Sequence, residues 1–275
     1  MASTDPKLVA GTEVPISSVL GEAVKRWILE VQNYSILCGQ AVLAVFLPPH
    51  YVSDVLDQMD IIGVGSVPIV MLTGFFIGAV LVLQTASQFV RFGETVLTGD
   101  AVSLALVREL GPTISGLLVA GRNASGIASE LGSMRVTEQV DAMRAMGTDP
   151  MRKLVVPRVM AAVLVLPLLT AMADIVGLFG GYLVSNFTLH IGPVVFWTHA
   201  IKILEFSDLM QGLAKPIFFG FILATVGCYK GLTVQGGTEG VGRATTQAVV
   251  ISSVIIIVSD TFLTKISLFL AGHNF

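Results

Sequence analysis

The stretch IIGVGSVPIVMLTGFFIGAVLVLQTA at 61–86 carries no charged residue and is apolar over almost its whole length. A helix needs about 20 mostly apolar residues to cross the hydrocarbon core of a bilayer, so this stretch predicts a membrane-spanning helix. Within it, Gly74 and Gly78 are four residues apart, a spacing that lets two membrane helices approach closely. We therefore expect a spanning helix that packs tightly against a neighbour.

The composition of the whole chain agrees with a membrane environment. Only 13% of the 275 residues are charged and the mean hydropathy is +0.81, whereas soluble domains carry roughly 25% charged residues. A formal net charge of −3 argues against a nucleic-acid binder, and two cysteines argue against a disulfide scaffold. We expect an all-α polytopic membrane protein with a single membrane domain over 1–275.

Four more apolar stretches follow the first along the chain, and each is long enough to cross a bilayer. With 61–86 they predict a five-span core over 61–270. The further spans are expected at about 101–120, 157–184, 209–229 and 247–270.

The N-terminal part, 1–48, differs from the core, because 16–47 begins as an amphipathic helix rather than as a uniformly apolar one. Trp27 follows Lys25 and Arg26, and a tryptophan beside basic residues is typical of a helix that lies in the headgroup region. The apolar second half is short and ends at Pro48-Pro49. We expect a cytoplasmic tail and an interfacial helix that dips into the bilayer, not a sixth span. The first residues lack the pattern of a signal peptide.

Basic residues are distributed unevenly between the two sides of the predicted spans. Eleven of the 16 lysines and arginines fall in the N-terminal segment and in the 121–158 and 230–246 connections, and two, Arg91 and Lys202, fall in the alternate loops. The positive-inside rule then places the N-terminus in the cytoplasm and the C-terminal residues 271–275 on the opposite side. The outer loop between spans three and four contains a short amphipathic helix near 191–204.

The cytoplasmic connection between spans two and three predicts an amphipathic helix over about 133–147. Gly147 suits the end of this helix, and Asp149-Pro150 would stop it. A helix of this length is not stable alone, so it either rests on the membrane with a solvated face or docks a cytoplasmic partner. Its apolar stripe is Val136, Val140, Met143 and Met146.

Charged side chains inside the predicted spans are costly, at about 2.5 kcal/mol or more each. Arg108 and Glu109 lie in span two, where they point about 100° apart and so need different neighbours. Pro112 can kink the helix just beyond them. The pair forms either a structural ion-pair network or a headgroup site in a cavity wall. Lys215 in span four is a third candidate for that site, or it snorkels to an interface. Structural or interfacial roles are expected for Asp174, Asp260 and Lys265.

Five motifs, in order along the chain, resemble the MlaE/YrbE permeases, the membrane subunits of ABC transporters that move lipids together with MCE-domain proteins. The resemblance extends from the interfacial helix to the end of span five. The motifs are LVRELGP at 106–112, AGR at 120–122, ELGSMRVTEQ at 130–139, MGTDP at 146–150 and GRATTQAVV followed by SS over 242–253.

The resemblance implies a permease of the bacterial inner membrane that works as a homodimer and moves phospholipid or a related lipid. Its implied partners are a cytoplasmic ABC ATPase, which would hold the ATP and Mg²⁺, a periplasmic MCE-domain protein and, in some systems, a STAS-domain protein. No cofactor, metal or catalytic residue is expected on this chain. The helix at 133–147 would be the coupling helix seated in the ATPase.

The candidate site residues fall into two groups, one within the membrane and one on the coupling helix. For Leu81 and Gln84, ordinary helix packing is the alternative to a place in the lipid cavity. Candidates for the lipid cavity are Leu81, Gln84, Phe92, Arg108, Glu109 and Lys215. Candidates for the ATPase contact are Arg135, Glu138, Gln139, Asp141 and Arg144.

Two other functions compete with a lipid permease. An ion-coupled secondary transporter would use Arg108, Glu109 and Asp174 as a relay. A membrane-embedded lipid-modifying enzyme is disfavoured, because the sequence contains no H-E-x-x-H, C-x-x-C or G-x-S-x-G motif. The G-x-x-x-x-G-K-[ST] phosphate-binding loop is also missing, so energy would have to come from a partner.

Overall fold

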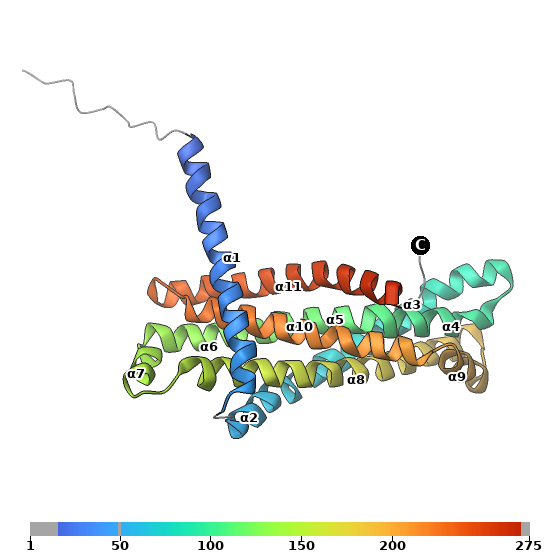
Figure 1. Cartoon of the computed structure of the whole chain (residues 1–275). Coiled ribbons are helices and arrows are strands. Elements are labelled where there is room, and N and C mark those ends of the chain that lie inside the picture. The colour runs from blue at the N-terminus through green and yellow to red at the C-terminus, as the bar shows by residue number, and fades with distance from the viewer. Residues whose placement is uncertain (1–15, 49–50, 271–275) are drawn as a thin grey trace, which may run out of the picture.

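The computed structural model describes residues 16–48 and 51–270, and every regular element in these ranges is helical. The expectations for residues 1–15 and for the C-terminal residues 271–275 lie outside the described residues. Long helices form an elongated bundle (Figure 1). Its members are α2 (Val52–Ile62), α3 (Val67–Phe92), α4 (Thr98–Ala105), α5 (Gly111–Val119), α6 (Ser125–Val136), α8 (Val156–Leu189), α10 (Phe206–Leu232) and α11 (Gly237–Leu270).

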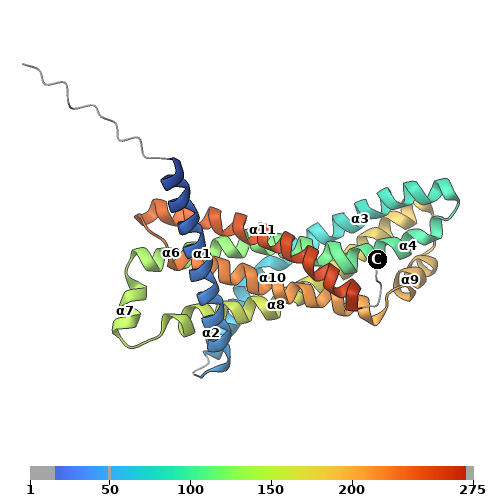
Figure 2. The same ribbon diagram turned by 45° about the horizontal axis from the view of Figure 1, so that its top comes forward.

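Two short helices lie at opposite ends of this bundle (Figures 1 and 2). Helix α7 (Gln139–Ala145) follows α6, and α9 (Pro193–Lys202) lies beside α4 at the other end. Helix α9 confirms the short helix expected between spans three and four. It begins at Pro193, whose ring fixes a helical φ and whose missing N–H is not needed in the first turn.

Six helical stretches of the described chain are long and apolar enough to cross a membrane, one more than the five expected. Five of them contain the expected spans. The sixth is Trp27–Phe46, the second half of α1 (Ile16–Phe46). Length and composition therefore do not separate α1 from the core spans.

The direction of α1 does separate it from the other long helices. In both views α1 crosses α8, α10 and α11 steeply, whereas these three run side by side along the bundle (Figures 1 and 2). Tyr34 holds the crossing point through a hydrogen bond between its hydroxyl and that of Thr225, 2.9 Å apart. Trp27, before the crossing, is 67% exposed.

The first core span is broken near its start, which the sequence analysis did not anticipate. Helix α2 ends at Ile62, a short turn follows, and α3 begins at Val67 with Pro68 in its first turn. Arg122 donates hydrogen bonds to the carbonyl oxygen of Ile61 (3.1 Å) and to Ser66 Oγ (3.0 Å). This side chain therefore satisfies part of the backbone that the break leaves without helical partners.

Helices α3 and α8 form the closest pair of the bundle. A Cβ on Gly74 would lie 2.8 Å from the carbonyl oxygen of Ala173, and one on Gly78 would overlap the carbonyl oxygen of Gly177. The glycine pair in α3 thus confirms the expected close approach, because any larger residue would force the two backbones apart.

The second span is much longer than the 101–120 stretch expected from hydropathy. Helix runs almost without interruption from Thr98 to Val136 and includes two π-helical turns, at Leu106–Leu110 and Ala120–Ala124. Polar residues such as Arg122 and Glu130 lie in its second half, so hydropathy alone underestimates its length. Pro112 does not break it, because the π turn just before the proline absorbs the change in hydrogen bonding.

Candidate functional site

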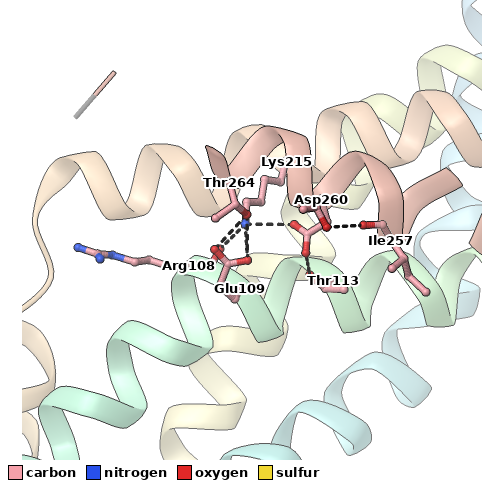
Figure 3. A network of polar contacts seen from close by, with 8 residues as sticks. Arg108, Glu109, Thr113, Lys215, Ile257, Asp260 and Thr264 are labelled. Atoms are coloured by element: carbon pink, nitrogen blue, oxygen red, sulfur yellow. Dashed lines mark hydrogen bonds and ion pairs between the residues drawn. The ribbon is translucent and has the colours of Figure 1, made fainter. Parts of the chain in front are cut away.

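A buried polar cluster joins three spans near the middle of the chain's bundle (Figure 3). At its centre lies Lys215 of α10, whose side chain is 3% exposed. Its Nζ lies 2.6 Å from Glu109 Oε2 in the π turn of span two and 3.1 Å from Asp260 Oδ1 in α11. The lysine therefore links α10 to both neighbouring spans through ion pairs.

Two threonine hydroxyls complete the cluster. Thr113 donates to Asp260 Oδ2 at 2.9 Å, and Thr264 donates to the Glu109 carboxylate at 3.2 Å. Each carboxylate thus has the lysine on one side and a hydroxyl on another. This arrangement meets the requirement that charges inside a membrane protein be paired and hydrogen-bonded.

The same lysine also donates a hydrogen bond to a backbone carbonyl that Pro112 leaves without a donor. Proline has no N–H, so the carbonyl four residues earlier, that of Arg108, lacks its α-helical donor. Lys215 Nζ donates to this oxygen at 2.9 Å. One turn before the lysine, a Cβ on Gly212 would overlap the carbonyl oxygen of Val107. Helix α10 therefore fits closely onto the π turn through a glycine and a lysine.

Arg108 points away from this cluster, as Figure 3 shows. Its partner is Asp208 in the first turn of α10, with Nε and Nη2 at 2.7 and 2.6 Å from Oδ1. Asp208 also accepts the backbone N–H of Glu205 in a capping box at the start of α10. The expectation that Arg108 and Glu109 have different neighbours is confirmed.

Lys215 donates hydrogen bonds to Arg108 O and to Glu109 Oε2, and it forms an ion pair with Asp260, whose Oδ1 has no hydrogen-bond partner among the described residues. This geometry favours the ion-pair network over a free headgroup contact for Lys215 itself. Arg108 and Glu109 are more open, with side chains 38% and 39% exposed.

Leu81 and Gln84 lie together in a separate, apolar groove along α3. The groove has a volume of about 470 Å³ and is also lined by Phe76, Val80 and Leu110. Leu110 is the residue after Glu109, so the groove and the buried cluster lie on adjoining parts of the same π turn.

Phe92 is not brought to this groove. It lies at the last residue of α3 and is 77% exposed. Gln84 is the last residue of α3 that lines the groove, and Phe92 lies beyond it along the helix.

Asp174 of α8 is buried but joins neither Arg108 nor Glu109 through a described contact. One carboxylate oxygen lies against Gly111, where a Cβ would overlap it, and this oxygen has no hydrogen-bond partner in the described structure. The three residues named for an ion relay are therefore dispersed among separate partners.

The connection between spans two and three differs from the single helix expected over 133–147. Helix α6 ends at Val136, and α7 begins only at Gln139. Glu138 between them has φ of +61°, in the left-handed region, which interrupts a right-handed helix. The expected apolar stripe is therefore split, with Val140 buried and Met146 exposed.

Ion pairs fold α7 back onto α6. Arg135 lies 2.6 Å from both oxygens of Asp141, and Arg144 lies 3.4 Å from the same carboxylate. Gln139 donates to the Thr137 hydroxyl at 2.9 Å. The five coupling candidates thus lie on one compact turn-and-helix segment, Arg135–Arg144, which we call the α6–α7 elbow.

Sequence reasoning missed the partners that complete the buried cluster. Asp208, Thr113 and Thr264 were not singled out, and Asp260 was expected to be only structural or interfacial. Their signal is weak in sequence, because a polar residue in an apolar run does not reveal which helix it faces. The position of Lys215 four residues before Phe219, on the buried face of α10, was the available hint.

The fold and these sites define a polytopic helical membrane protein with paired charges inside the bundle and a helical elbow between two spans. The family model of the permease MlaE matches residues 55–266. The chain belongs to this family.

Curated relatives agree with this assignment. A probable ABC transporter permease protein of Rickettsia felis is 42% identical, over 91% of this chain and 97% of the relative. The chloroplastic protein TRIGALACTOSYLDIACYLGLYCEROL 1 of Arabidopsis thaliana is 37% identical, over 87% and 69%. The intermembrane phospholipid transport system permease protein MlaE of Haemophilus influenzae is 35% identical, over 76% and 80%. The chain is thus a multi-pass membrane permease of the ABC-transporter type, a transport subunit rather than an enzyme.

Proposed function

We propose that this permease moves phospholipid, or a related lipid, between the inner membrane and a periplasmic MCE-domain partner, as one half of a homodimer. A separate cytoplasmic ATPase would drive it, with a STAS-domain subunit as a further candidate partner. The observation that carries the proposal is the apolar groove on α3 next to the paired charges of the π turn. An acyl chain suits the groove, and the partly exposed Arg108 and Glu109 directly precede Leu110, which lines it.

The open groove also supports the proposed homodimer. Leu72, Phe76 and Val80 line it and remain 61%, 57% and 49% exposed in the single chain. A second copy facing the same surface would convert an open groove into an enclosed cavity for lipid. Leu81 and Gln84 would then line the cavity wall, and Phe92 would lie beyond its end.

The connection between elbow and groove suggests how ATP binding could act on lipid. The α6–α7 elbow is the end of the same helical run that contains the π turn at Leu106–Leu110. A push on the elbow would be carried along α6 and α5 to Glu109, because a hydrogen-bonded helix is stiff along its axis. The π turn at Leu106–Leu110, which Lys215 contacts, would then be the point at which the helical run from Thr98 to Val136 can bend.

The proposed membrane placement follows from the same geometry. The elbow marks the cytoplasmic end and α9 the outer end of the bundle. Helix α1 crosses the bundle near the cytoplasmic end (Figure 1), which supports an interfacial helix rather than a sixth parallel span. An ion-coupled transporter is less favoured, since no hydrogen bond or ion pair among the described residues joins Asp174 to Arg108 or Glu109.

The coupling role can be tested by charge reversal at Arg144, which is 62% exposed on the elbow. We expect Arg144→Glu to weaken ATPase binding about tenfold, equivalent to about 1.4 kcal/mol, because an exposed contact charge is replaced by a repelling one. ATPase co-purification and transfer of a fluorescent phospholipid to the MCE-domain protein would be measured. Lys202→Glu, the same change on α9, is the control. Normal binding and transport by Arg144→Glu would contradict the coupling assignment.

A further inference from the structure

A second hollow lies at the cytoplasmic end of the bundle. None of its lining residues belongs to α3, on which the apolar groove lies. It has a volume of about 410 Å³ and is bordered by α1, the end of α10 and the start of α11. Polar side chains dominate its wall, unlike that of the groove. We call it the α1 hollow, and its polar lining residues include Glu30, Asn33, Lys230, Gln235, Arg243 and Gln247.

Two cations from different helices meet in the α1 hollow. Lys230 lies at the end of α10 with its side chain 11% exposed, and Arg243 comes from the second turn of α11. The guanidinium of Arg243 reaches over the connecting loop, because a Cβ on Gly236 would lie 3.3 Å from its Nη2. Both charges therefore lie beside the same loop.

The acidic partners of these cations are held loosely. Glu30 is 3.5 Å from Lys230 and its side chain is 62% exposed, while Glu239 is 3.3 Å from Arg243 and 82% exposed. Exposed ion pairs of this kind contribute little free energy. An anion that brings several acceptor oxygens could therefore take over the donors of both cations, and the Asn33 and Gln247 amides border the same space.

The position of the hollow favours a phosphate that is attached to a lipid. Helix α1 passes beside it and exposes Val24, Trp27 and Ile28 at 55%, 67% and 53%. A helix with exposed apolar residues and a tryptophan at its membrane end suits the headgroup level of a bilayer. Basic pockets between membrane helices on the cytoplasmic side are typical binding sites for phospholipid headgroups.

We infer that the α1 hollow binds the phosphodiester of a glycerophospholipid from the cytoplasmic leaflet, through Lys230 and Arg243. This lipid is separate from the transported one and joins the end of α10 to the start of α11 beside α1. Helix α1 stays attached without the Glu30–Lys230 ion pair, through its buried Leu37 and Ala41 and through the hydrogen bonds of Tyr34 to Thr225 and of the Tyr229 hydroxyl to the Glu30 carbonyl at 3.3 Å. The choice of leaflet rests on the proposed orientation, whereas the binding itself does not.

The test counts lipids on the purified full-length chain by native mass spectrometry, with phosphatidylglycerol added to the detergent. We expect the double variant Lys230→Gln/Arg243→Gln to retain about one phosphatidylglycerol fewer per chain than the unchanged protein, because both phosphate-binding cations are lost. Arg91→Gln/Lys202→Gln is the matched control, since it removes one lysine and one arginine from the exposed opposite end. Gel filtration and circular dichroism would verify that both variants are folded.

The outcomes separate this proposal from the alternatives. Equal lipid retention by both double variants and the unchanged protein would overturn the site, and equal loss from both would show a general charge effect and also overturn it. If millimolar inorganic phosphate displaces phosphatidylglycerol, the site binds free phosphate rather than a lipid headgroup, and the proposal is wrong. Because the measurement uses neither ATPase nor a sealed membrane, a failure of the proposed transport function would leave its result unchanged.

Discussion

Lys215 illustrates how a single side chain can satisfy several requirements of a membrane interior. It forms ion pairs with Glu109 and Asp260 and donates a hydrogen bond to the Arg108 carbonyl, which Pro112 leaves without a donor. A lysine in the hydrocarbon region is costly when alone, and removing one partner of such a group leaves an unpaired buried charge. The cluster is therefore best understood as a clamp on the π turn, with Arg108 and Asp208 as a second clamp beside it.

Residue-scale packing leads to a prediction at the contact between α3 and α8. Gly78→Ala should lower the free energy of unfolding by about 1–3 kcal/mol, because the added methyl overlaps the Gly177 carbonyl and must push the helices apart. Thermal unfolding in detergent would measure the change.

The matched control for this substitution is Gly126→Ala, also within a long helix, where a Cβ would meet nothing within 4 Å. Its effect should stay below about 1 kcal/mol and be stabilising, since alanine favours helix. If the two variants unfold at the same temperature, the close approach of α3 and α8 is wrong.

At the scale of elements, the α6–α7 elbow depends on one strained residue. Glu138 adopts a left-handed conformation that costs a non-glycine residue roughly 1–2 kcal/mol. The Arg135–Asp141 pair and the burial of Val140 hold the segment in place despite this cost. The bend that these contacts hold makes α7 a separate short helix rather than an extension of the span.

This strain predicts different stabilities for two variants at position 138. Glu138→Gly should be more stable than Glu138→Ala by about 1 kcal/mol, because glycine adopts the left-handed conformation without steric cost. Both variants lose the carboxylate, so the difference in stability between them reports the cost of the left-handed backbone conformation alone. Hydrogen exchange of the amides in α7 would report it, and greater protection in the alanine variant would contradict the left-handed turn.

At the scale of the whole molecule, the bundle has two chemically different ends. The elbow, the end of α10 and the start of α11 lie at one end, and α9 with the start of α10 lies at the other (Figure 2). The end of α10 carries Lys230, and the start of α11 carries Arg243. Since basic loops are retained in the cytoplasm, this asymmetry supports the proposed orientation, with the elbow in the cytoplasm. The groove on α3 lies between the two ends, as the proposed lipid pathway requires.

Orientation can be tested with single cysteines at the two ends of a variant in which Cys38 and Cys228 are alanine. Met146→Cys and Val194→Cys replace side chains that are 74% and 77% exposed. A maleimide that cannot cross membranes should label Val194→Cys on intact spheroplasts, and Met146→Cys only after permeabilisation. The reverse pattern would invert the proposed topology.

The amino-acid sequence by itself determined the membrane class, the approximate positions of five of the six helices in the described residues that are long and apolar enough to cross a membrane, and the family, because these depend on apolar run length and on ordered motifs. It also indicated the glycine contact of α3, since the spacing of Gly74 and Gly78 places both on one helix face. It underestimated span two, because polar residues such as Arg122 and Glu130 lower the hydropathy of its second half.

Only the tertiary structure decided which charges meet. Lys215, Glu109 and Asp260 come from three helices, and a one-residue change in helix rotation would turn each by about 100°. No local pattern encodes that choice, nor the left-handed turn at Glu138, which is held by the Arg135–Asp141 pair. Apolar run length is a local property of the chain, whereas partners across helices are set by packing of the whole bundle.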